Sequence, residues 1–341
     1  MSANGPSYTV SDLLVQAQHA IDSFEFELAQ QFAERALSME PNNVDALETA
    51  GAIELELGLY DEAQDIQPDT GFSKYMYLGQ MSEQLEAIQY FQRGVDLMMA
   101  ERQAMTPDLT TGSEYWLLSN KISTALCSMT DIYLTDCCFE PDAEQKCEQY
   151  LGQALQIEPV TPEVYQTLAS VRLSQQRLED AKLALAQGLG IWLSADPDDE
   201  FNLIPEYETR LALVKLLLET AMYDEAFTVL NGLIEENDQV PDTLYLFGWA
   251  NYICAEEMND TDSSAVEQRN EQLENAREAL NACVKLWHMT GSTDKPLLQH
   301  TQELLSNITQ VLGPEVESKE DAEEDMDGGD IEYEDEDEEM Q

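Results

Sequence analysis

Small residues recur twelve positions apart along this chain, and this spacing constrains its fold more than any other feature. The interval occurs in four pairs, one of which includes a valine: Ala17 and Ala29, Gly51 and Ala63, Ala169 and Ala181, Val214 and Ala226. Only a very small side chain lets two helix backbones approach closely, while larger apolar residues fill the flanks. The spacing therefore predicts helix pairs, each joined by a short turn, repeated in tandem.

The helix pairs resemble tetratricopeptide repeats. The segment "LYDEA" at 59–63 returns almost unchanged as "MYDEA" at 222–226, and Pro41 and Pro159 follow predicted second helices. Three further units, at 72–98, 117–159 and 243–287, are distorted. The unit at 117–159, the fourth of the chain, has a long first helix, and the last unit has a polar insertion near 256–270. We expect an all-α solenoid of about seven repeats over 8–312, with a capping helix at 297–312 and a disordered acidic tail at 313–341.

Negative charge dominates the composition. The chain has 69 Asp and Glu against 16 Lys and Arg, a net charge of −53. Residues 315–341 account for −15, so the remainder still carries −38. Such a surface repels nucleic acid phosphates and anionic lipid, and it attracts basic proteins at long range. We therefore expect no direct nucleic acid or membrane contact, and a strongly basic protein partner.

Catalytic and metal-binding patterns are missing from the sequence. The N-terminus lacks a signal peptide pattern, and no apolar run is long enough to span a bilayer. We expect the six cysteines to be reduced and mostly buried, and we find no zinc-type spacing. We expect His19, His288 and His300 at the surface or at helix ends. Without a phosphate loop or nucleophile elbow, we expect no enzyme, no cofactor and no metal.

The first helix of each pair lines the concave face of such a solenoid, so its residues that are not needed for packing are candidates for binding. We expect the acids to accept hydrogen bonds from Arg and Lys, and the aromatic residues to stack on guanidinium groups. The alternatives are a solvated charge for any single acid and core packing for the tyrosines. The candidates are Asp45, Glu48, Glu56, Asp131, Asp136, Glu163, Gln166, Glu208, Glu219, Asp242, Tyr245, Trp249 and Tyr252.

The central units are similar to a particular family. The segments "GFSKYMYLGQMSEQLEAIQYFQRGVDLM", "LSNKISTALCSMTDIYLTDCCFEPDAEQKCEQYLGQAL" and "QTLASVRLSQQRLEDAKLALAQGLGIW" resemble the dedicated assembly chaperones of large-subunit ribosomal protein L-four, over about residues 8–312. The resemblance implies a holding chaperone that shields the basic extension of newly made L-four and accompanies it to the nuclear pre-60S ribosome. It also implies movement between cytoplasm and nucleus. We expect a monomer in a one-to-one complex and, because the chain has no Lys/Arg cluster, an importin engaged through the client.

Other binding functions compete with this one. Co-chaperones that hold the acidic C-termini of heat-shock chaperones need Lys, Arg and Asn on the first helices, whereas Leu14, Gln18, Glu48 and Ala52 stand there. We reject that function because the charges do not complement. A general acidic chaperone for histones or other basic proteins, and a scaffold in a multiprotein assembly, both remain open. The tail could be a second contact for the client or a solubilising segment.

Overall fold

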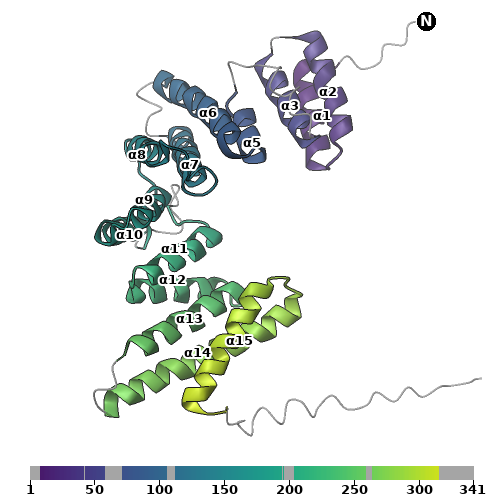
Figure 1. The fold of residues 1–341 in the computed structure, drawn as a ribbon. Helices are drawn as coiled ribbons and strands as arrows, with labels where there is room; N and C mark the ends of the chain where they lie inside the picture. The colour runs from purple at the N-terminus through teal and green to yellow at the C-terminus, as the bar shows by residue number, and fades with distance from the viewer. Residues whose placement is uncertain are drawn as a thin grey trace, which may run out of the picture. The chain divides into compact units, whose positions relative to one another are not determined.

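The computed structural model is built from helix pairs, as the spacing predicts (Figure 1). It describes residues 8–41, 43–57, 71–105, 112–193, 195, 203–258 and 263–314. The chain divides into two compact units, residues 1–220 and 221–341. Every regular element within the described residues is a helix, so the expected all-α fold is confirmed. Of the predicted disordered tail at 313–341, residues 315–341 lie outside the described residues, and so does the predicted small residue Ala63.

The first unit contains successive helix pairs that pack on one another. Its helices are α1 (Val10–Asp22), α2 (Phe26–Met39), α3 (Val44–Glu56), α5 (Ser73–Met81), α6 (Gln84–Ala104), α7 (Ser113–Leu134), α8 (Ala143–Ala154), α9 (Pro162–Ser174), α10 (Leu178–Trp192) and α11 (Tyr207–Glu219). The expected long first helix of the fourth unit is α7, which has 22 residues. Helix α7 also contacts α9, so consecutive first helices lie side by side.

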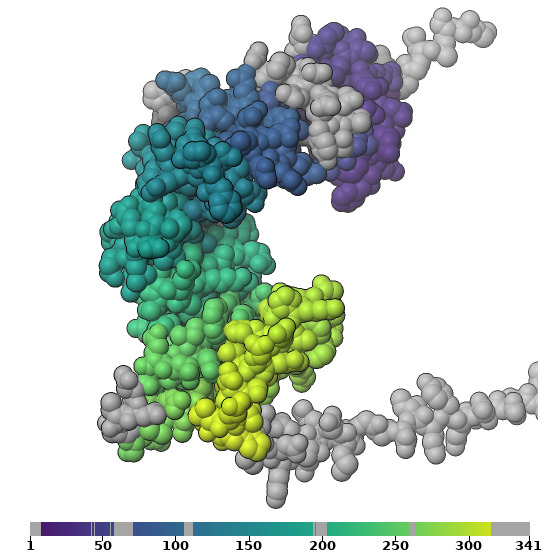
Figure 2. Space-filling model, viewed as in Figure 1, coloured from purple at the N-terminus to yellow at the C-terminus, as the bar shows by residue number. Residues whose placement is uncertain are grey.

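The second unit contains α12 (Tyr223–Glu236), α13 (Pro241–Glu257), α14 (Ser263–Thr290) and α15 (Lys295–Leu312). Helices α13 and α14 form a pair, and α15 packs against both (Figure 2). Helix α15 is the predicted capping helix, and Thr301, Leu304 and Ile308 are the residues it buries. The polar insertion expected near 256–270 is largely helical, because α14 begins at Ser263 and runs for 28 residues.

The small residues at the predicted contacts are buried. Ala17, Ala29, Ala169 and Ala181 are each 0% exposed. In the distorted third unit, a side chain added at Gly79 would lie 2.9 Å from the ring of Phe91 on the next helix. The sequence pattern therefore located small residues that are buried where paired helices pack.

The turns of three clean repeats have a left-handed residue at a fixed position. Phe24, Gln176 and Ala221 have φ of 57°, 60° and 54°. Each stands five residues before the small residue of its second helix; Phe24, for example, precedes Ala29. Left-handed backbone costs a residue with a Cβ about 1–2 kcal/mol. Gly58, at the corresponding position of the second repeat, lies outside the described residues.

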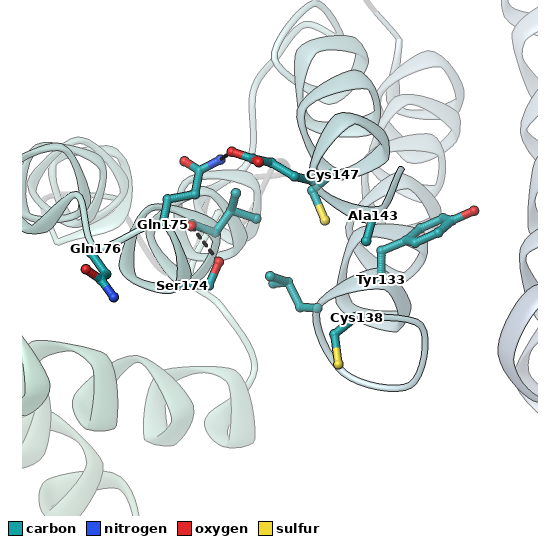
Figure 3. A pocket seen from close by; sticks show the side chains of 10 residues that line it. Tyr133, Cys138, Ala143, Cys147, Ser174, Gln175 and Gln176 are labelled. Carbon is teal, nitrogen blue, oxygen red and sulfur yellow. Dashed lines mark hydrogen bonds between the residues drawn. The ribbon is translucent and has the colours of Figure 1, made fainter. Parts of the chain in front are cut away.

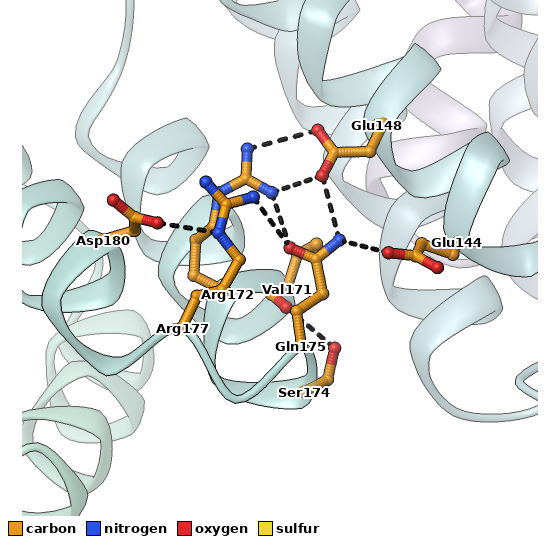
Figure 4. A network of polar contacts seen from close by, with 8 residues as sticks. All are labelled: Glu144, Glu148, Val171, Arg172, Ser174, Gln175, Arg177 and Asp180. Atoms are coloured by element: carbon orange, nitrogen blue, oxygen red, sulfur yellow. Dashed lines mark hydrogen bonds and ion pairs between the residues drawn. The ribbon is translucent and has the colours of Figure 1, made fainter.

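Polar side chains join α8 to α9 (Figure 4). Arg172 on α9 pairs with Glu148 on α8, and this hydrogen bond is the largest cause that lowers the pKa of Glu148. The Gln175 amide Nε2 donates to Glu148 Oε1 at 2.9 Å and to Glu144 Oε1 at 3.1 Å. These contacts hold one helix pair against the next, so Arg172 and Glu148 have a structural task.

Close packing of α13 on α14 predicts a specific loss of stability. A methyl group at Gly248 would lie 2.6 Å from Leu280 Cγ and 3.2 Å from the carbonyl oxygen of Ala276. We expect Gly248→Ala to lower the free energy of unfolding by about 1–3 kcal/mol in chemical denaturation, because the buried Leu280 must shift. The control Gly232→Ala on α12 adds its methyl group to open space and should raise stability by up to about 1 kcal/mol. Equal effects of the two changes would contradict this packing.

Candidate functional site

Three first helices enclose an acidic hollow in the first unit. It has a volume of about 620 Å³ and is open to solvent. We call it the acidic hollow. Its lining residues are Thr124, Cys127, Ser128 and Asp131 from α7, Glu163, Gln166, Thr167 and Ser170 from α9, and Glu208, Thr209, Ala212, Lys215 and Leu216 from α11. Four of the predicted binding residues, Asp131, Glu163, Gln166 and Glu208, therefore lie in one hollow.

The acidic hollow has three carboxylates and one ammonium group, from Asp131, Glu163, Glu208 and Lys215. Asp131 and Glu208 are exposed, and Glu163 is half-buried. Within the part of the chain that the structure describes, no cation lies within ion-pair distance of these three carboxylates. The hollow can therefore accept hydrogen bonds from Lys or Arg side chains of another protein.

Asp131 is the carboxyl group most affected by its surroundings. Its side chain reaches solvent, but the walls of the hollow displace enough water to raise its pKa from 3.8 to about 6. Burial also raises the pKa of the neighbouring Cys127 thiol to about 12, and the carboxylates of Asp131 and Glu163 contribute to that rise. A thiol with so high a pKa is a poor nucleophile, so Cys127 is not suited to covalent chemistry.

Gln166 helps to fix the relative position of two walls of the hollow. Its amide Nε2 donates a hydrogen bond to the carbonyl oxygen of Thr209 at 3.2 Å, which joins α9 to α11. Gln166 thus lines the acidic hollow and also holds α9 against α11.

The other predicted acids of the first unit lie outside the acidic hollow. Asp45, Glu48 and Glu56 are exposed on α3. Asp136 is exposed in the turn after α7, and Glu219 is exposed at the last position of α11. Their role in binding stays a prediction.

The predicted aromatic residues on α13 turn toward α15. Tyr245 stacks on Trp249 with ring centroids 6.0 Å apart, and the Tyr245 hydroxyl lies 2.8 Å from Nδ1 of His300. Tyr252 also packs against the core of this unit, while Asp242 is half-buried near the start of α13. Part of the surface of each aromatic side chain is therefore covered by packing within the protein. His300, expected at the surface or at a helix end, is half-buried inside α15 because it packs against these rings.

Several lining residues of the acidic hollow escaped the sequence analysis, among them Thr124, Ser128, Thr167 and Ser170. Ser128, Thr167 and Ser170 stand three or four positions from predicted residues on the same helix, as Ser128 does from Asp131, and Thr124 stands two turns before Asp131. Residues at these spacings share one helix face. The helical period, applied along α7 from Asp131 and along α9 from Glu163 and Gln166, would have found them. The same period connects Lys215 to the predicted Glu219, four positions later on α11.

A second hollow of about 490 Å³ lies where the ends of α7 and α9 meet α8 (Figure 3). Tyr133, Cys138, Cys147 and Gln175 are among its lining residues, and it contains none of the predicted ones. Burial raises the pKa of Cys147 to about 11, so this thiol stays protonated. Four of the six cysteines are buried, so the expectation that most of them are buried is confirmed.

Metal-binding clusters of three or more His, Cys, Asp or Glu are absent from the residues that the structure describes. None of the described helices combines the length and the apolar character that crossing a membrane requires.

Comparison with known proteins gives consistent results. No family model matches the chain. A probable assembly chaperone of rpl4 from Schizosaccharomyces pombe is 34% identical over 75% of this chain and 74% of its own length. One from Emericella nidulans is 32% identical over 90% of this chain and 82% of its own length. The solved structure of Acl4, an assembly chaperone of RpL4, covers 73% of this chain and 98% of its own, with 31% identity and a TM-score of 0.63.

The raised pKa of Asp131 predicts a pH-dependent stability. Between about pH 4 and 6 the folded state holds this proton more tightly than the unfolded state, so stability decreases as pH rises through this window. We expect Asp131→Asn to raise the Tm by about 2 °C at pH 7.5 and to leave it unchanged at pH 4. Asp136→Asn, which removes a carboxylate outside the hollow, serves as the control. Equal shifts at both pH values would contradict the cause assigned here.

Proposed function

The chain belongs to the family of assembly chaperones of ribosomal protein L-four, and we propose that it is itself a dedicated chaperone that binds newly made L-four. The observation that carries the proposal within this chain is the acidic hollow, where three carboxylates from three helices share the lining with a single ammonium group, that of Lys215. Among the described residues no cation lies within ion-pair distance of these carboxylates. A segment rich in Lys and Arg supplies the missing partners. In the free client, the same segment would bind RNA prematurely or aggregate.

The binding energy must come from many contacts. An exposed ion pair contributes only about 0.2–1 kcal/mol. Asp131 should contribute more than its neighbours, since a cation restores interactions that its carboxylate loses in the hollow. The remaining first-helix acids, such as Asp45 and Glu48 on α3, extend the negative surface, and the net charge of −53 accelerates encounter with a basic client.

A general chaperone for histones would use the same charges. Family membership favours a single client, and the desolvated carboxyl group of Asp131 favours a bound segment over loose attraction. We therefore rank histone binding second. We further propose a monomeric binding protein without catalytic activity, which acts in a one-to-one complex and contacts neither nucleic acid nor membrane directly. The acidic tail would offer a second, less specific contact to the client.

The chain has no cluster of Lys and Arg that an importin would recognise. We propose that the complex enters the nucleus through a signal on the client and releases L-four at the pre-60S ribosome. The chaperone would then shuttle between cytoplasm and nucleus.

A pull-down tests the client and the site together. The tagged protein, washed at about 0.3 M salt to remove loosely attracted proteins, should retain near-stoichiometric L-four. Glu163→Lys with Glu208→Lys should weaken that binding about tenfold, or about 1.4 kcal/mol, since two attractive contacts become repulsive.

Glu27→Lys with Glu179→Lys is the matched control, because it changes the net charge equally on the exposed faces of the second helices α2 and α10. Equal weakening by both pairs would mean that net charge alone decides binding. Recovery of many histones and ribosomal proteins in place of L-four would contradict a dedicated client.

Import through the client predicts where the protein accumulates. A fluorescent fusion should lose its nuclear signal when L-four is depleted, and the Glu163→Lys, Glu208→Lys variant should stay in the cytoplasm even with L-four present. Nuclear signal that persists without L-four would show that the chaperone enters independently.

A further inference from the structure

An apolar hollow lies beside the acidic one. It has a volume of about 270 Å³ and is lined by residues of α5, α6 and α7, together with Phe72 just before α5. We call it the apolar hollow after its aromatic and aliphatic lining residues, which are Phe72, Met76, Tyr77, Phe91 and Ala125. The other lining residues are polar and include one cation, Lys121, at the α7 wall. None of its lining residues in the described part of the chain is acidic. Its character therefore differs from that of a surface with 69 carboxyl groups.

The floor of the apolar hollow is firmly held. Phe91 is 6% exposed, and Phe72 and Met76 pack against the core of the first unit. Tyr77 is 49% exposed and leaves part of its ring open to a ligand. The Lys121 ammonium group lies 5.2 Å above the Phe72 ring. A large apolar side chain placed here would leave water and contact aromatic faces, which is favourable.

The two hollows are continuous within the first unit. Thr124 and Ser128 line both of them, and these residues stand one turn apart on α7. Along α7, Ala125 and Asp131 are about 9 Å apart at 1.5 Å per residue. The offset between neighbouring helices brings the distance between the two hollows to roughly 10–15 Å. An extended chain covers this distance in about three to five residues.

We propose that the segment of L-four bound in the acidic hollow also places one large apolar side chain in the apolar hollow, about three to five residues from a Lys or Arg. This inference rests on the proposed function and deepens it. The recognised unit is then an apolar anchor followed or preceded by a basic residue, and not positive charge alone.

The charges of the protein argue for this occupant. A second copy of the chain would bring a further net charge of −53 to the same surface and would be repelled. An acidic peptide would be repelled by the three carboxylates of the neighbouring acidic hollow. A basic segment with an apolar anchor suits both hollows at once.

Overlapping peptides that tile L-four, measured by fluorescence anisotropy against the full chain, provide the test. The tightest peptide should contain a large apolar residue three to five positions from Lys or Arg. Replacing that apolar residue with Ala keeps the peptide charge and should weaken binding at least tenfold. The loss should persist at about 0.5 M salt, because apolar contacts are not screened.

Protein variants assign the loss to the apolar hollow. Tyr77→Ala should weaken binding of the original peptide severalfold and should reduce the further effect of the peptide substitution. Met76→Glu, a second variant, places a charge in the hollow and should weaken binding more. Leu183→Ala on α10 removes an apolar side chain that is 60% exposed elsewhere and should have no effect.

The outcomes separate this inference from the proposed function. If L-four binds the wild-type chain but the Ala-substituted peptide binds as tightly as the original, the apolar anchor is wrong and the proposed function stands. If the losses from Tyr77→Ala and from the peptide change are simply additive, the anchor does not occupy this hollow. If neither L-four nor any of its peptides binds, the proposed function itself fails.

Discussion

The close approach of paired helices at very small side chains is the constraint on which the structure depends. Ala29 and Ala181 are fully buried on second helices, and a side chain larger than a methyl group would force the pairs apart. The turns that bring each second helix back are equally constrained, since Phe24 and Gln176 accept left-handed backbone to make them. With the pairs fixed in this way, the first helices α7 and α9 come side by side.

The acidic hollow follows from that packing and from the composition of the chain. Helices α7, α9 and α11 each bring one acid to a common space, in Asp131, Glu163 and Glu208. With 16 basic residues against 69 acidic ones, the chain cannot supply partners for most of its carboxylates. The basic residues it has are used partly for structure, as Arg172 is between α8 and α9 (Figure 4). A basic client is then the natural source of the missing cations.

Sequence reasoning predicted the features that depend on period and composition. The twelve-residue spacing predicted the helix pairs, and the first-helix rule named thirteen binding candidates, of which Asp131, Glu163, Gln166 and Glu208 line one hollow. It missed what depends on contacts between distant segments. Nothing near His300 in sequence indicates that it meets Tyr245, 55 residues earlier.

The sequence analysis missed the apolar hollow for a similar reason. Met76 and Tyr77 in its lining come from α5, and only eight positions separate Gly79 on α5 from Ala87 on α6 in place of twelve. The repeat rule could not assign faces there, and Met76 and Tyr77 were left without a role.

The central claim is that first-helix carboxylates bind basic side chains of L-four. Zero-length carbodiimide cross-linking of the complex, read by mass spectrometry, tests it most directly, because it joins only carboxylates and amines in contact. The account predicts cross-links from client lysines to Asp131, Glu163 and Glu208. Cross-links confined to acids of the second helices, such as Glu27 and Glu179, would contradict it.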